Sequence, residues 1–258
     1  MNQKSSTYNK WIEFVNQLFA KKSFGIFAAK DKKGSPVFLE WEKATVKDPA
    51  YSKNMKEIAD VACRAYTDVE VGFLKSFPQV VQSQDYYREF REFFKNGIEQ
   101  VDWMFVEKQM YAQIKQLYEM DCSQFSGKDT YVFVKVKDQK TKELLGFTTF
   151  LIKPEYPQKS VKDISIGLVP QVQGRGLGKL LISAIFKIIP QVERIFLCAR
   201  VTNDRAIRAY NVWGFAHDLN PLQDPNFTFE KEHWVSLEYK VQNSDILQNI
   251  AKSFDDVK

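Results

Sequence analysis

The sequence predicts an α+β fold, in which helices flank a twisted and mostly antiparallel sheet, and three observations support this. Apolar residues recur at helical spacing through much of residues 49–120. Two strand-like runs, 131–136 and 144–152, are separated by a turn and are typical of an antiparallel hairpin. A third strand-like run, 160–169, leads through a glycine-rich turn into an apolar helix.

The first part of the chain contains helices and one hairpin by its periodicity. The expected elements are an amphipathic helix at 8–19, strands at 24–29 and 36–41, a helix from 49 to 66, a loop or broken helix at 67–83, and a long helix at 84–120 divided near Gly97. We expect residues 1–45 to form a helix-and-hairpin arm that packs on a main domain of residues 46–258.

After residue 130 the pattern alternates between strands and helices. The expected strands are 131–136, 144–152, 160–169, 195–201 and 233–241, and the expected helices are 179–189, 204–213 and 247–254. In the run 160–169, strict alternation places Ile164, Ile166 and Leu168 together on one face of the strand.

The composition fits a folded protein with a hydrophobic core. Of its 258 residues, 44% are hydrophobic and 27% are charged, which excludes a disordered tail, a collagen-like repeat and a disulfide-knotted peptide. The three cysteines, Cys63, Cys122 and Cys198, are widely spaced, and there are only two histidines, so we expect no metal site. The apolar stretch after Trp11 is interrupted by charges, which predicts no membrane partner and, with free thiols, a cytoplasmic location.

The most informative segment is the turn Gln173–Lys179, which lies between a predicted strand and a predicted helix. Glycines let the backbone approach a ligand closely, and the free N–H groups at a helix start favour an anion. Residues 171–210 hold seven Lys or Arg against two acidic residues, a surplus that equals the net charge of +5 of the whole chain. The segment therefore predicts an anionic ligand such as a phosphate.

Two common phosphate-binding motifs are excluded by spacing. A nucleotide triphosphatase loop ends in Gly-Lys-Ser or Gly-Lys-Thr, whereas Lys179 is followed by Leu180. A dinucleotide-binding turn has the pattern G-x-G-x-x-G, whereas the last glycine here, Gly178, comes one residue too early.

The residues of this turn resemble those of the GNAT superfamily of N-acetyltransferases. Gln173, Gly176 and Gly178 match the family's strand–turn–helix motif, and Pro170 stands where the family often has proline. A second motif follows at the family's spacing and consists of Asn203, Ala206, Tyr210 and the pair Gly214–Phe215. The resemblance covers residues 131–241 and implies a GNAT-like three-layer α/β/α fold with a mixed, mostly antiparallel sheet.

The resemblance implies an acetyl-CoA-dependent N-acetyltransferase, in which a primary amine attacks the thioester directly and no metal takes part. The implied cofactor-binding residues lie at the strand end, in the glycine turn and before the next helix, and are Leu168, Val169, Gln173, Gly174, Arg175, Gly176, Leu177, Gly178, Lys179 and Asn203. Tyr210 stands at the position of the general acid, which protonates the departing thiolate of CoA. A backbone N–H near Leu168 would hold the oxyanion. The implied partners are acetyl-CoA and an amine acceptor, with a monomeric or homodimeric protein.

Several alternatives stay open at the level of single residues. The general base is one of Asp163, His217 or Glu70, and the sequence does not choose among them. Tyr210 is alternatively a core tyrosine, and Asn203 is alternatively only a helix cap.

The rival functions belong to two other classes. The first is a catalytically silent acyl-CoA-binding module that keeps the cofactor site and lacks an acceptor pocket. The second is a nucleic-acid binder that uses the basic surplus of residues 171–210, but no nucleic-acid-reading motif accompanies that surplus. The acceptor is a small molecule, a peptide or a protein, and the sequence does not decide which.

Overall fold

The computed structural model describes residues 3–119, 129–218, 233–241 and 246–257, and Cys122 lies outside them. The helices are α1 (Gln3–Lys21), α2 (Pro49–Ser76), α3 (Val80–Ser83), α4 (Trp103–Glu119), α5 (Leu177–Ile188), α6 (Asp204–Val212) and α7 (Ile246–Lys252), with 3-10 turns η1 (Asp85–Phe94), η2 (Ile98–Gln100) and η3 (Pro170–Val172). The strands are β1 (Phe24–Lys30), β2 (Pro36–Ala44), β3 (Thr130–Asp138), β4 (Leu144–Ile152), β5 (Ser160–Leu168), β6 (Arg194–Arg200), β7 (Ala216–His217), β8 (Trp234–Lys240) and β9 (Asp255–Asp256).

The strands form one mixed sheet in the order β7-β8-β6-β5-β4-β3-β2-β1-β9. Neighbouring strands are antiparallel except β5 and β6, which are parallel. The predicted α+β fold with a mixed, mostly antiparallel sheet is confirmed. The β1–β2 hairpin extends this sheet, because β2 pairs with β3; the division of the chain at residue 45 stays a prediction.

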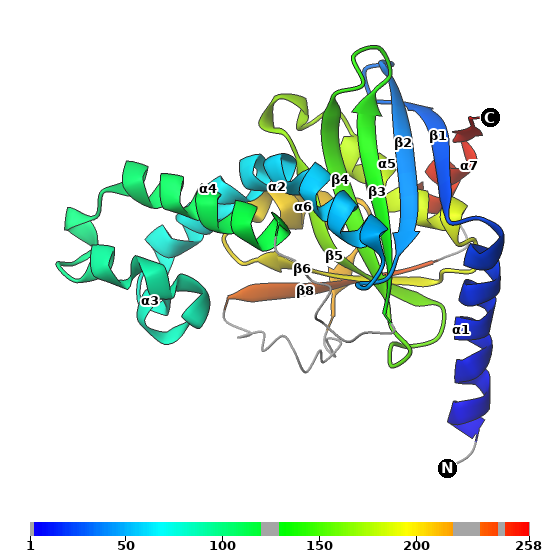
Figure 1. Cartoon of the computed structure of the whole chain (residues 1–258), viewed down its shortest axis with the longest axis horizontal. Coiled ribbons are helices and arrows are strands. Elements are labelled where there is room, and N and C mark those ends of the chain that lie inside the picture. The colour runs from blue at the N-terminus through cyan, green and yellow to red at the C-terminus, as the bar shows by residue number, and fades with distance from the viewer. Residues whose placement is uncertain (1–2, 120–128, 219–232, 242–245, 258) are drawn as a thin grey trace.

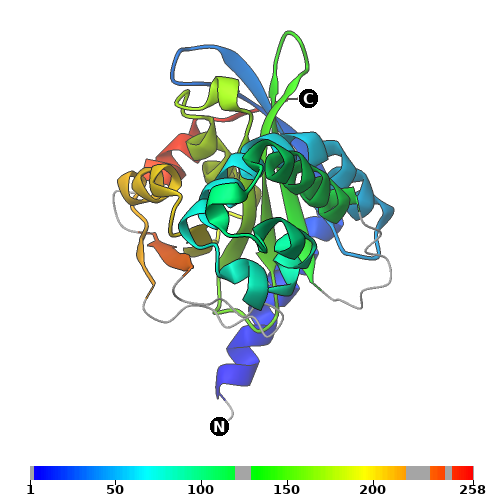
Figure 2. The same ribbon diagram turned by 90° about the vertical axis from the view of Figure 1, so that its left-hand side faces the viewer.

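Helices cover both faces of the sheet, so the fold has three layers (Figure 1). On one face α2 packs against β2, β4 and β5, and α4 packs on α2. On the other face α5 packs against β3, β4 and β5, and α7 packs on α5. The segment from α3 to the start of α4 extends beyond the sheet and faces the viewer in Figure 2.

Helix α2 is longer than its sequence pattern predicts. It begins as expected, with Pro49 at its first position and the Asp48 carboxylate accepting the Ala50 N–H at 3.0 Å. The loop or broken helix expected at 67–83 is wrong for its first half, because α2 continues to Ser76. Buried Phe73 and Leu74 extend the packed stripe and outweigh the low helix propensity of Gly72, which precedes them.

The α-helix expected from Gln84 onward is also wrong in its first part. Residues 85–94 form the 3-10 segment η1, with Tyr87 and Phe90 buried three residues apart, which matches three residues per turn. The expected division near Gly97 is confirmed, since Gly97 has a φ of +91° between η1 and α4. None of the described helices has the length and apolar character that a membrane crossing requires.

Candidate cofactor and catalytic site

Strands β5 and β6 separate after a short parallel ladder. Pairing joins only Ser160–Lys162 to Arg194–Phe196, although β5 continues to Leu168 and β6 to Arg200. On its other side β5 stays paired with β4 as far as Leu168. Beyond Lys162, therefore, one hydrogen-bonding side of β5 is not paired with β6.

In an antiparallel ladder, the backbone N–H groups of successive residues point alternately to the two sides of the strand, which identifies the β5 groups on the side that β6 leaves unpaired. The Val169 N–H donates to the Leu145 carbonyl at 3.0 Å, so residue 169 bonds toward β4. Because residues of such a ladder alternate, the N–H groups of Leu168 and Ile166 point away from β4, toward the diverging β6. The expectation that Leu168 offers its backbone fits this geometry, whereas the N–H of Val169 is engaged by β4.

A β-bulge breaks the predicted alternation in the middle of β5. Thr149 pairs with Ser165 and Phe150 with Asp163, which leaves Ile164 without a partner on β4. The side chain of Ile164 is 42% exposed, although β5 is a central strand. The centre of β5 is thus accessible to solvent at the point where the sheet opens.

The glycine turn has the conformation that its sequence demands. Gly174 and Gly176 both have a φ of +82°, which L side chains rarely adopt, and Gly176 is the left-handed N-cap of α5. Within the described chain, no hydrogen bond engages the N–H groups of Gly174, Gly176, Leu177 or Gly178. Four donors at a helix N-terminus form a site that suits a phosphate.

Other groups of the turn are already used within the protein. The Gln173 N–H donates to Pro170 O at 3.3 Å, and its side chain donates to Leu168 O at 3.3 Å while accepting from Arg205. Partial burial lowers the pKa of Lys179. A Cβ at Gly178 would lie 2.9 Å from the Trp213 ring, so this glycine allows α5 and α6 to pack closely.

Arg175 is held by an aspartate from the β1–β2 hairpin. Its Nε and Nη2 both lie 2.6 Å from Oδ2 of Asp31, whose Oδ1 accepts the N–H groups of Lys33 at 2.9 Å and Ser35 at 2.8 Å. Burial alone would raise the pKa of Asp31, but these hydrogen bonds outweigh it and hold the pKa below its ordinary value. The Lys32 N–H also donates to Arg175 O at 2.8 Å, so the hairpin tip is attached to the glycine turn.

Asp163 and Tyr210 are both buried side chains. Asp163 is 4% exposed; its Oδ1 accepts the Thr148 hydroxyl and the Ser165 N–H, each at 3.1 Å, and its Oδ2 has no hydrogen-bond partner among the described residues. Burial raises the pKa of Asp163 to about 7. Burial, and secondly the charge of Asp163, raise the pKa of Tyr210, which places the two groups within electrostatic reach.

Two further tyrosines from the helical layer join this cluster. Burial and the nearby Asp163 raise the pKa values of Tyr66 on α2 and Tyr118 on α4. Tyr118 hydrogen-bonds to Ser165 and lies beside the Tyr66 hydroxyl, which has no well-aligned partner among the described residues. These two residues were not predicted as part of the site, because each belongs to an ordinary amphipathic stripe.

The other two candidates for the general base are placed elsewhere. Glu70 forms a two-pronged ion pair with Arg200, with N–O distances of 3.0 and 2.9 Å, and accepts the Tyr87 hydroxyl. His217 is exposed on β7, which β8 and β6 separate from β5. Of the three candidates, Asp163 is the one whose charge raises the pKa of Tyr210.

Several further side chains have partners within the protein. The Asn203 side chain caps α6 by accepting the Ala206 N–H at 3.2 Å. Phe73 and Phe77 pack around the ring of His233 and fill the core. The basic residues of 171–210 do not share one surface, since four are paired at different places, namely Arg175 with Asp31, Lys187 with Asp256, Arg194 with Glu238 and Arg200 with Glu70.

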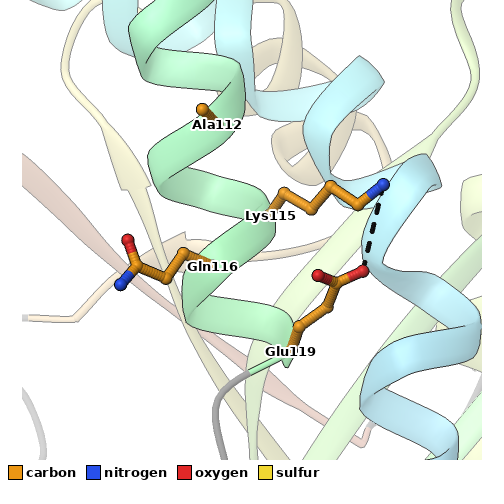
Figure 3. Close-up of a pocket in the computed structure, with 4 residues that line it drawn as sticks. All are labelled: Ala112, Lys115, Gln116 and Glu119. Atoms are coloured by element: carbon orange, nitrogen blue, oxygen red, sulfur yellow. Dashed lines mark ion pairs between the residues drawn. The ribbon is translucent and has the colours of Figure 1, made fainter.

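Two surface hollows are lined by residues of α4. One, of about 390 Å³, is lined by Ala112, Lys115, Gln116 and Glu119 of α4 alone, with Lys115 and Glu119 3.9 Å apart (Figure 3). The other, of about 550 Å³, lies between α2, α4 and the Pro170–Gln171 turn, and so adjoins the start of the glycine turn. In the described ranges, no group of three or more His, Cys, Asp or Glu residues is placed to hold a metal ion.

The splayed parallel pair, the bulge and the glycine turn together define an acyl-CoA N-acyltransferase type of fold. The family model "Acetyltransferase (GNAT) family" matches residues 83–215, just over half of the chain, and the protein belongs to that family. A comparison of the sequence with curated proteins found no match.

Three solved structures that resemble the chain are acetyltransferases of low sequence identity. The chain is 15% identical to the PaiA N-acetyltransferase from Thermoplasma acidophilum in complex with coenzyme A, over 79% of this chain and 99% of that one, with a TM-score of 0.41. It is 18% identical to the ribosomal-protein-S18-alanine N-acetyltransferase from Escherichia coli, over 47% and 75%, with a TM-score of 0.35. It is 17% identical to nourseothricin acetyltransferase, over 43% of this chain and 65% of that one, slightly less than two thirds, with a TM-score of 0.34.

Proposed function

We propose that this protein transfers the acetyl group of acetyl-CoA to a primary amine. One observation carries the proposal: β5 diverges from β6 directly before a left-handed glycine turn whose four N–H groups have no partner among the described residues. Acetyl-CoA has the matching parts in the matching order, since a peptide-like pantetheine arm leads to a pyrophosphate.

The cofactor's two parts would bind by backbone hydrogen bonds. The pyrophosphate accepts the free N–H groups between Gly174 and Gly178, where the α5 dipole favours negative charge. The pantetheine amides lie along β5 and bond to the side that Ile166 and Leu168 present, as an added strand would. The acetyl group then reaches the bulge at Ile164, and a β5 N–H there stabilises the oxyanion, because the Leu168 N–H expected for this role from the sequence is used by the pantetheine arm.

The two buried ionisable groups divide the proton transfers. Asp163, with a pKa near 7, is ionised in a large fraction of molecules at neutral pH and accepts the proton of the acceptor's ammonium group. Tyr210, whose pKa is raised by burial, stays protonated and donates to the thiolate of CoA as it leaves. The amine attacks the thioester carbon directly, the C–S bond breaks, and no covalent enzyme intermediate forms.

The acceptor itself is proposed only as a class. A primary amine on a small molecule, a peptide or a protein satisfies the chemistry at Asp163 and Tyr210. The rival, an acyl-CoA-binding module without turnover, predicts cofactor binding with no acetylated product across a broad amine panel.

The test of the proposed function is calorimetric titration with acetyl-CoA, followed by turnover with amines. The Gly176→Glu variant places a carboxylate in the phosphate turn and is expected to abolish binding. Gly97→Glu is the matched control, because Gly97 has a similar φ of +91° and open space around it, and lies in the η1–α4 segment. Absence of acetyl-CoA binding by the wild-type protein, or equal loss in both variants, would refute the proposal.

A further inference from the structure

The arginine of the glycine turn cannot serve as the main cation for the cofactor's phosphates. Both Arg175 nitrogens that reach Asp31 lie 2.6 Å from one carboxylate oxygen, and the Asp31 side chain is fully buried. A buried ion pair of this kind is costly to break, because each charge would lose its partner without regaining water. The guanidinium of Arg175 is therefore neutralised by the β1–β2 hairpin.

The same contact brings a different cation to the turn. Lys32 follows Asp31 at the hairpin tip, and its N–H bonds to Arg175 O at 2.8 Å. A Cβ built on Gly176 would lie 3.3 Å from the Cβ of Lys32, so the lysine side chain starts directly beside the left-handed N-cap of α5. Lys32 is exposed, and its ammonium group is free to turn toward an anion at that N-cap.

The nearby carboxylates are already hydrogen-bonded to other groups. Asp31 is occupied by Arg175 and two backbone N–H groups, and Asp138, which lies within electrostatic reach of Arg175, accepts the N–H groups of Lys140 and Thr141. Phosphate oxygens form their strongest hydrogen bonds with charged donors.

We propose that Lys32, presented by the β1–β2 hairpin, is the residue that neutralises the phosphates of the bound acyl-CoA in place of Arg175. Asp31 then has a positioning role, because its pair with Arg175 and its Asx turn hold the hairpin tip on the glycine turn. This inference rests on the proposed function and assigns part of the cofactor site to a hairpin more than 130 residues earlier in the chain.

The test compares acetyl-CoA affinity in Lys32→Glu, Lys32→Met and Lys47→Glu by calorimetry. Lys47 is the control: it is exposed, its charge reversal is identical, and it lies beyond the opposite end of β2, a strand of about 30 Å. We expect Kd to rise by about 10-fold or more in Lys32→Glu and by a smaller factor in Lys32→Met, and to stay within about twofold in Lys47→Glu. Thermal melting should be unchanged in all three.

Repeating the titrations with 3′-dephospho-acetyl-CoA locates the phosphate that Lys32 meets. If Lys32→Glu still weakens binding of this analogue, Lys32 meets the pyrophosphate. If the loss of affinity disappears, Lys32 meets the 3′-phosphate. Equal affinities of Lys32→Glu and Lys47→Glu, with normal wild-type binding, would overturn this inference and leave the proposed function intact. Failure of the wild-type protein to bind acetyl-CoA would overturn both.

Discussion

Asp163 links stability to pH because its carboxyl group is buried in the middle of β5. Its pKa is about 7 in the folded protein against an ordinary value of 3.8, so the native state holds a proton that the unfolded chain has lost between these pH values. Stability therefore falls as pH rises from about 4 to about 7, by about 4 kcal/mol at most.

Asp163→Asn should remove this loss of stability at high pH and be more stable than the wild type at pH 8. The variant should also lose most of its turnover, together with the increase in turnover that the wild type shows as pH rises through about 7. Denaturant unfolding at pH 4.5 and pH 8, with a pH–rate profile, measures both effects. Asp60→Asn, at an exposed carboxylate, is the control and should change neither by much. A variant that keeps wild-type activity would exclude Asp163 as the base.

Tyr210 is predicted to act on the chemical step alone. Tyr210→Phe keeps the ring contacts with Trp213 and Phe215 and removes only the proton donor, so kcat should fall by about 10²- to 10⁴-fold at an unchanged Kd for acetyl-CoA. Tyr66→Phe is the matched control within the same cluster and should alter kcat by only a few-fold. Turnover by Tyr210→Phe at the wild-type rate would remove the acid role.

Among the elements, the glycine turn allows the stability cost of a left-handed backbone to be measured separately from the cost of a tertiary contact. Gly174 and Gly176 share a φ of +82°, but only Gly176 has a neighbour, the Lys32 side chain. Each substitution by alanine should cost about 1 to 2 kcal/mol for the left-handed backbone.

Gly176→Ala should cost more than Gly174→Ala, because Lys32 is fixed by its backbone bond to Arg175 and cannot move aside. Guanidinium unfolding of the two variants measures the difference. An equal or smaller loss at Gly176 would show that the hairpin tip yields at that contact.

The elements also show what a sequence can predict. The strands β3, β4, β5, β6 and β8 and the helices α5 and α6 follow local periodicity and turn residues, and they were predicted to within a few residues, whereas the two-residue strands β7 and β9 were not predicted. The end of α2 and the 3-10 segment η1 were not, because packing of Phe73, Leu74 and Tyr87 decides them and no local pattern marks it.

The candidate site likewise combines residues that local sequence marks with residues that only tertiary contacts bring together. The glycine turn and Tyr210 are prominent because short motifs carry them, whereas Asp163 was one of three candidates for the base among which the sequence did not choose. Asp31 was not predicted as a partner of Arg175, since a contact between residues 144 positions apart has no local signal. The β5 bulge was missed for the same reason, and it changed the exposure of Ile164.

For the whole molecule, the pair of Glu70 and Arg200 fastens the helical layer to the sheet. It joins α2 to β6, Tyr87 adds η1, and Arg200 lies 4.1 and 4.0 Å from the rings of Phe73 and Trp234. Because Arg200 is only 6% exposed, loss of its partner leaves a charge that water cannot solvate.

Glu70→Gln should therefore lower the free energy of unfolding by about 3 to 5 kcal/mol. Lys115→Met, which breaks the exposed pair with Asp60, should cost about 1 kcal/mol or less. Denaturant unfolding of both variants decides the question, and similar losses would mean that the Glu70 pair is no more than a surface contact.

The short ladder between β5 and β6 also bears on aggregation. An open row of backbone donors and acceptors is normally a template for a strand of another molecule, which is why proteins cover or charge their outermost strands. Here the row lies inside the sheet, with β4 on one side and β6 on the other, and the three ladder pairs close one end of the opening. A single extended chain can enter such a slot, but the flanking strands obstruct a folded hairpin or a second sheet. The sheet thus offers main-chain recognition to a slender ligand without inviting self-association through the same groups.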